Sequence, residues 1–253
     1  MSVMTLASNS RLKDQPSAQW QAAGFGVTKA WAGSSALPSV AGELSGIITT
    51  KSGDGGVLAG EIQLDDKFTQ VSMRDALRKK PTVVHIASHF QFQAGDQTNS
   101  FLLLGDGGRL SMAELRTSAS LFGGVQLLTL SACNTGVGDG AEVEGFGALA
   151  QRQGAKAVIA SLWPVADAST SFLMREFYRI RESTPGLSKA AAMAQAQLEL
   201  LRGTAQPAPG PERAMIHEAD AVPVTAPSFT VNPDAPYAHP YYWAPFFLMG
   251  NWL

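Results

Sequence analysis

The sequence predicts an α/β protein, a three-layer α/β/α sandwich built around a mostly parallel central sheet. Short apolar runs rich in valine, isoleucine and leucine recur along the chain, and their nearly continuous hydrophobicity is typical of strands that helices cover on both faces. Segments with helical periodicity separate these runs. Because strands and helices alternate, each crossover helix can pack against the sheet formed by the strands that it connects.

Six runs are candidates for strands. The three strongest are nearly continuous in apolar residues, and they are 81–88, 125–131 and 155–161. The three weaker candidates are 2–8, 24–30 and 244–251. We expect most of them to lie parallel in one sheet.

A long helix should follow the strand at 155–161. We expect it to begin near Ser169 or Thr170 and to continue through the segment FLMREFYRIRE. Leu173, Phe177 and Ile180 then share one stripe and should face the sheet. A second helix is expected over 186–202, with the Ser188 hydroxyl as its N-terminal cap. Its predicted buried face consists of Leu187, Ala190, Ala191, Ala194, Leu198 and Leu201.

Shorter helices are expected over 39–49, 73–79 and 144–153, the last of them ending at Gly154. The segment 203–236 contains seven of the fourteen prolines and little periodicity, so we interpret it as a proline-rich surface insertion within one domain that spans residues 1–253. A chain of this length can bury a large core.

Composition excludes several kinds of partner. The chain has 253 residues, 16% of them charged, and a formal net charge of -2, so it lacks the basic surplus that nucleic-acid binding requires. Its single cysteine, Cys133, can form neither an internal disulfide nor a thiolate metal cage, and we expect no metal or cofactor. We find no signal peptide and no apolar run long enough to span a membrane, and therefore expect a cytoplasmic protein.

Two of the strongest strands end in reactive side chains. The strand 83–88 leads into His89, and the strand 125–131 leads almost directly into Cys133 and a glycine-rich loop. If the strands are neighbours, imidazole and thiol face one cleft, where the imidazole can deprotonate the thiol. From these residues alone, the other interpretation is that Cys133 is a small core residue.

Four segments resemble the CHAT family in the family's own order. They are HIASH, LLTLSACNTG, EGFGALAQRQGAKAVIASLWPVAD and HPYYWAPFFLMGNW, and the resemblance extends from about residue 37 to residue 253. CHAT domains are caspase-like cysteine peptidases of clan CD, related to separases, metacaspases and caspases. The resemblance therefore implies a caspase-like fold, and it suggests that the chain is the C-terminal part of a longer protein that carries a regulatory region of TPR repeats.

The resemblance also implies catalytic roles. The family's catalytic histidine falls on His89 and its nucleophile on Cys133, and the backbone N–H groups of Phe90 and Cys133 would bind the oxyanion. Caspase-type sites usually have glycine where this chain has Phe90, which places the geometry of that loop in question. His85, inside the strand, is interpreted as a core histidine bonded to neighbouring polar groups.

Substrate binding is assigned to Asp167 and Trp163, also by resemblance. In separases an aspartate after the corresponding strand recognises a basic side chain, and Asp167 occupies the matching position. The alternatives are that Asp167 caps the following helix and that Trp163 fills the edge of the core.

The predicted function is that of a cysteine endopeptidase that hydrolyses a protein or peptide partner through a thioacyl-enzyme. The alternative is a catalytically silent or latent CHAT-fold domain with an interaction or regulatory role. A third hypothesis is a thiol hydrolase or acyltransferase that uses the same two residues on a small molecule.

Overall fold

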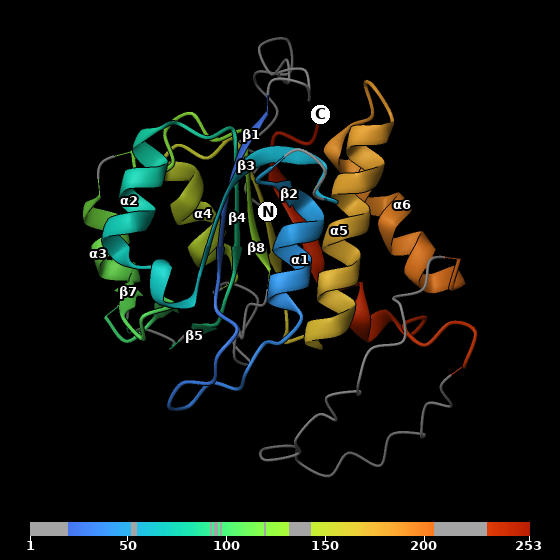
Figure 1. Cartoon of the computed structure of the whole chain (residues 1–253), viewed down its shortest axis with the longest axis horizontal. Coiled ribbons are helices and arrows are strands. Elements are labelled where there is room, and N and C mark those ends of the chain that lie inside the picture. The colour runs from blue at the N-terminus through green and yellow to red at the C-terminus, as the bar shows by residue number, and fades with distance from the viewer. Residues whose placement is uncertain are drawn as a thin grey trace.

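The computed structural model describes residues 20–51, 55–91, 93, 96, 98–118, 120–131, 143–204 and 232–253. In the helix that begins at residue 143, it describes side chains only from residue 147 onward. A twisted sheet forms the central layer, and helices lie on both of its faces (Figure 1). The expected three-layer α/β/α architecture is confirmed. The expected strand at 2–8 lies outside the described residues, as do 205–231 of the proline-rich segment.

The central sheet has the strand order β10-β9-β8-β4-β1-β3-β2, and only β10 runs antiparallel to its neighbour. A second, small antiparallel sheet has the order β5-β6-β7. The strands are β1 (Gln21–Gly26), β2 (Ile48–Thr49), β3 (Leu58–Leu64), β4 (Val83–Ala87), β5 (Phe90–Gln91), β6 (Phe101–Leu103), β7 (Arg109–Ser111), β8 (Leu127–Ser131), β9 (Ala157–Ser161) and β10 (Phe246–Gly250).

The helices divide between the two faces of the sheet. In Figure 1, α2, α3 and α4 cover one face, and α1, α5 and α6 cover the other. The bounds are α1 (Val40–Ile47), α2 (Gln70–Arg78), α3 (Met112–Thr117), α4 (Val143–Arg152), α5 (Asp167–Ser183) and α6 (Lys189–Arg202), with 3-10 turns η3 (Asp65–Lys67) and η4 (Pro240–Tyr242). Successive residues of β4 and β8 therefore point into different apolar clusters, which explains why both strands are buried throughout.

Several expected elements are shifted in the structure. The first strand among the described residues, β1, ends at Gly26, because the chain turns there into the loop before α1. The strand expected over 24–30 therefore begins and ends earlier than predicted. Helix α2 begins at Gln70, three residues earlier than expected, because Thr69 and Ser72 form a capping box. Helix α5 begins at Asp167 and buries Leu173, Phe177 and Ile180 as predicted. The strands β2, β3 and β5 to β7 were not expected.

The predicted buried face of α6 is wrong, although its cap at Ser188 is confirmed. Leu198 and Leu201 are 40% and 41% exposed, whereas Met193, Ala196 and Leu200 are buried. Alanine occurs on both faces of this helix, so the two leucines were not enough to fix its orientation. The observed face is the one that packs against α5 and the sheet.

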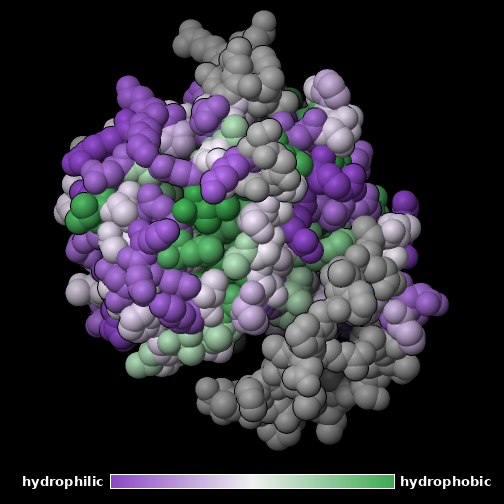
Figure 2. Space-filling view, in the orientation of Figure 1, coloured by the Kyte–Doolittle hydropathy of each residue, from purple (hydrophilic) through white to green (hydrophobic). Residues whose placement is uncertain are grey.

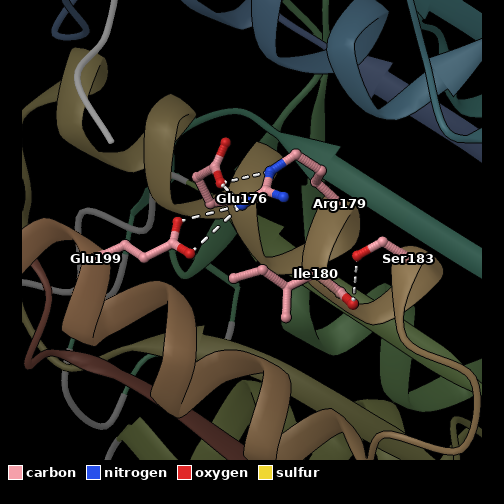
Figure 3. Close-up of polar contacts among 5 residues, drawn as sticks. All are labelled: Glu176, Arg179, Ile180, Ser183 and Glu199. Atoms are coloured by element: carbon pink, nitrogen blue, oxygen red, sulfur yellow. Dashed lines mark hydrogen bonds and ion pairs between the residues drawn. The ribbon is translucent and has the colours of Figure 1, made fainter. Parts of the chain in front are cut away.

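An exposed ion-pair cluster also connects α6 to α5. Arg179 donates from Nε to Glu176 at 2.7 Å and from a terminal nitrogen to Glu199 at 3.3 Å (Figure 3). The same view shows the Ser183 hydroxyl donating to the carbonyl of Ile180 at 3.2 Å. Half of the Arg179 side chain is exposed, so each such ion pair stabilises the fold by at most about 1 kcal/mol.

The surface between α2 and α1 is more apolar than the rest of the face shown in Figure 2, where hydrophilic residues cover much of the helices. Strand β3 lies in this region, and residues Gly60–Leu64 of it are half-buried. No helix among the described residues has the length and apolarity that a membrane span requires.

Helix α1 packs closely against the sheet at two glycines of β1. A Cβ atom at Gly24 would come within 3.0 Å of Leu44 Cδ2, and one at Gly26 within 2.6 Å of Val40 Cγ1 and 2.8 Å of Leu44 Cδ1. The missing side chains therefore let α1 lie directly on β1. This position matters because the loop before α1 reaches the predicted active site.

Candidate active site

The ends of β4 and β8 lie side by side in the sheet. The two strands pair in parallel, and their last paired residues are Ala87 and Ser131. The Ser88 N–H continues the pairing by donating to the Ser131 carbonyl at 3.2 Å. His89 and Cys133 each follow a residue of this last pair by two positions. The expectation that the two strands are neighbours is confirmed, whereas Cys133 itself lies outside the described residues.

His89 is half-buried, and a backbone carbonyl holds its ring. The distance from His89 Nε2 to the carbonyl oxygen of Ser35 is 2.8 Å. Because a carbonyl can only accept, Nε2 must carry the hydrogen, and in the neutral ring Nδ1 then has the lone pair. The ring is thus fixed in both orientation and tautomer.

Burial lowers the pKa of His89 below its usual 6.5, because the charged ring is desolvated. The bond to the Ser35 carbonyl and the negative charge of Asp167 act in the opposite direction and raise the pKa, without overcoming the burial. At neutral pH the ring is therefore mostly uncharged and able to accept a proton.

Asp167 is the first residue of α5, and its carboxylate reaches across to the start of α1. The N–H of Ser39, the residue that precedes α1, donates to Asp167 Oδ2 at 2.7 Å. The expectation that Asp167 caps its own helix is wrong, because Ala166 is the residue before α5 and no side chain caps that end. Desolvation raises the pKa of Asp167, and the charge of Glu43 adds to this, while the bonds from Ser39 and the charge of His89 lower it.

The other two predicted site residues lie at the same edge of the sheet. Trp163, after β9, is half-buried and donates from its indole nitrogen to the carbonyl of Tyr241 in η4 at 3.0 Å. Phe90 begins β5, pairs with Leu102, and has a buried side chain. The segment HPYYW thus packs against the loop that contains Trp163.

His85 is a core histidine, as expected. It lies on β4 and has no exposed surface, and its Nε2 lies 2.7 Å from Oε1 of Glu43 in α1. Its Nδ1 lies 3.4 Å from the hydroxyl of Tyr178 of α5, which in turn lies 2.8 Å from the Thr129 hydroxyl on β8. All four side chains are buried.

Comparison with protein-family models gives a match that covers nearly the whole chain, to the CHAT domain over residues 2–251. The chain belongs to the CHAT domain family. The resemblance seen in the four sequence segments is thereby confirmed, together with the α/β fold that it implied.

Among solved structures, this CHAT domain is similar to the complex of Porphyromonas gingivalis RgpB pro- and mature domains. The two share 13% sequence identity with a TM-score of 0.44, over 71% of this chain and 42% of that chain. No curated protein matches the chain.

Three features of the CHAT domain site could not be found in the sequence. They are the carbonyl of Ser35 on His89, the Asp167–Ser39 bond, and the Glu43–His85 pair. Each joins segments that are 42 to 128 residues apart, and one partner is often a backbone group, which every residue has. In the part of the chain that the structure describes, no three histidine, aspartate or glutamate side chains form a metal-binding group.

Proposed function

We propose that this CHAT domain is a cysteine endopeptidase in which Cys133 is the nucleophile and His89 the general acid and base. The observation that carries the proposal is the position of His89 at the end of β4, with its tautomer set by Ser35, next to the end of the strand that leads to Cys133. Two residues of chain span at most about 7 Å, so a thiol two positions beyond Ser131 is compatible with contact to this ring.

The reaction balances with these two groups and water. The sulfur of Cys133 attacks the carbonyl carbon of the scissile peptide bond, and its proton passes to Nδ1 of His89. The bond from carbon to nitrogen then breaks, and His89 returns the proton to the leaving amine, which leaves a thioester. Water, activated by the same nitrogen, hydrolyses the thioester and releases the acid and the free thiol.

Two further roles belong to this proposal. The N–H groups of Phe90 and Cys133 would bind the oxyanion of the tetrahedral intermediate. Asp167 and Trp163 would line the pocket for the side chain that precedes the scissile bond, and the half-buried carboxylate of Asp167 favours a basic one. The substrate would be a protein or a peptide.

A peptide acyloxymethyl ketone tests the proposal, because it is attacked by an activated thiol and can be made with arginine or leucine before the reactive group. We expect intact-mass spectrometry to show one adduct on the wild type and none on Cys133→Ala, with a loss of at least about 100-fold in His89→Ala. Labelling that does not depend on His89 would contradict the proposal. Absence of labelling by either probe would favour a silent or latent domain.

A further inference from the structure

A buried pair of a carboxylate and an imidazole lies beside the elements that hold His89. Glu43 of α1 is 1% exposed and His85 of β4 is 0% exposed, and Glu43 Oε1 lies 2.7 Å from His85 Nε2. The other ring nitrogen faces Tyr178, whose hydroxyl meets Thr129. The proposed reaction uses none of these four side chains.

Burying such a pair in a core is less favourable in free energy than burying apolar side chains. Both groups lose their hydration, and apolar side chains of the same volume often give equal or greater stability. The bond between them is directional, whereas apolar contacts are not. A buried polar pair therefore fixes the geometry of the elements that it joins better than it stabilises them.

The two elements joined here are the ones that reach the candidate site. In α1, Glu43 donates its N–H to the carbonyl of Ser39 at 2.8 Å, and the N–H of Ser39 in turn donates to Asp167. Four residues before Ser39, the carbonyl of Ser35 accepts from His89. On β4, His85 precedes His89 by four residues of the same chain segment.

We propose that Glu43 and His85 are positioning residues for His89. Their bond sets α1 against β4, and so places the Ser35 carbonyl and the Asp167 carboxylate around the imidazole at the end of β4. The inference rests on the proposed function, because it concerns the orientation of the histidine that acts on the substrate.

Apolar packing alone fixes only part of this arrangement. The glycines Gly24 and Gly26 set how closely α1 approaches β1. The contact between α1 and the next strand, β4, contains the Glu43–His85 bond, and β4 is the strand that ends at His89.

The decisive variant is Glu43→Leu/His85→Leu, which removes both polar groups and so leaves no buried group unpaired. Such double replacements are close to neutral for stability. We expect it to retain a cooperative thermal transition but to lower the maximal inactivation rate constant by the arginine acyloxymethyl ketone about 10- to 100-fold, because a small misplacement of a catalytic group has this effect. The concentration for half-maximal inactivation by the leucine probe, which does not use the Asp167 carboxylate, should change by less than about threefold.

Two single variants separate geometry from charge. Glu43→Gln keeps an oxygen at the same reach and should retain the inactivation rate constant within about threefold. Glu43→Asp keeps the charge but is one methylene shorter, and should lower it at least about tenfold. Tyr178→Phe is the matched control, because it changes a neighbour of the same ring and leaves the Glu43–His85 bond in place. It should label at the wild-type rate.

The outcomes distinguish this inference from the proposed function. Wild-type labelling that depends on Cys133 and His89, with an unchanged rate constant in the double variant and in Glu43→Asp, would overturn the positioning role alone. Equal losses in Tyr178→Phe and Glu43→Asp would also overturn it, because they would reflect a general effect of stability. If the double variant lacks a cooperative transition, the comparison of Glu43→Gln with Glu43→Asp decides the question. Wild type that no probe labels would remove both proposals.

Discussion

The hydroxyl groups of Tyr178 and Thr129 meet in the core between α5 and β8, and their contact gives a quantitative test of the fold. They lie 2.8 Å apart, and both residues have 0% exposure. Burial raises the pKa of Tyr178 well above its usual value of 10, so this phenol stays neutral at any pH at which the protein is handled. The perturbation is Tyr178→Phe, which removes one hydroxyl with little change in shape.

Removing one partner leaves the Thr129 hydroxyl buried without Tyr178. An unsatisfied buried hydroxyl costs about 1–3 kcal/mol, so we expect the free energy of unfolding to fall by about 2 kcal/mol. For a domain of this size the melting temperature should then fall by about 4–8 °C. Thr129→Val should have a similar effect. The double variant removes both hydroxyls but also the contact of His85 Nδ1 with the Tyr178 hydroxyl, so it should remain less stable than the wild type while losing clearly less than the sum of the two single losses.

Urea unfolding followed by tryptophan fluorescence, with a melting curve for each of the four proteins, measures the cycle. Equal slopes against urea concentration are needed, because the comparison assumes that each variant exposes the same surface on unfolding. The reasoning is refuted if the double variant loses the sum of the two single losses, since the hydroxyls would then not be partners.

Three further predictions concern the charge of Asp167, the packing of α1 against β1 and the N-terminal cap of α6. Asp167→Asn should shift the acid limb of the pH–labelling profile to lower pH, because the negative charge of Asp167 raises the pKa of His89 in the wild type and is absent from the variant; an unchanged limb with a loss only for the arginine probe would support the pocket role instead. Gly26→Ala should destabilise the protein by about 1–3 kcal/mol in urea through overpacking, whereas Gly42→Ala, whose Cβ would meet nothing within 4 Å, should stabilise it by about 0.5–1 kcal/mol; equal effects would contradict the close approach at Gly26. Ser188→Ala should lower the free energy of unfolding by about 1 kcal/mol through the lost cap, and no change would show that its bond to Ala191 contributes nothing.

The sequence predicts best those parts of the fold in which burial is complete. Strands β4, β8 and β9 are buried at every residue, so their apolar runs identify them without ambiguity. Strand β3, in contrast, contains Glu61 and Gln63 and is half-buried along most of its length, and it was not expected. Strand β2 pairs only with Leu58 and Ala59, so the rest of β3 lies at the edge of the sheet, where no continuous apolar run is needed.

For the site, the sequence indicates which residues carry reactive groups but not what holds them. The sequence identifies His89 and Asp167, and the structure places them close enough for their charges to interact. Two of the contacts that hold them use backbone groups, the carbonyl of Ser35 and the N–H of Ser39. Every residue has such groups, so the type of residue does not predict the contacts. Nothing in the sequence marks Glu43 as buried, because a glutamate in an amphipathic helix is usually exposed.

The bond between Ser39 and Asp167 brings together the amino-terminal ends of two helices, α1 and α5. Each helix end carries a partial positive charge from its aligned peptide dipoles. These dipoles do not titrate, so the positive potential that they create beside His89 persists at every pH at which the fold is intact. The carboxylate of Asp167 lies where the two potentials add, and unlike them it can gain or lose a proton. When Asp167 is protonated, its negative charge no longer cancels the positive potential of the two helix ends. That potential then favours any negative charge that develops on a substrate at this end of the sheet.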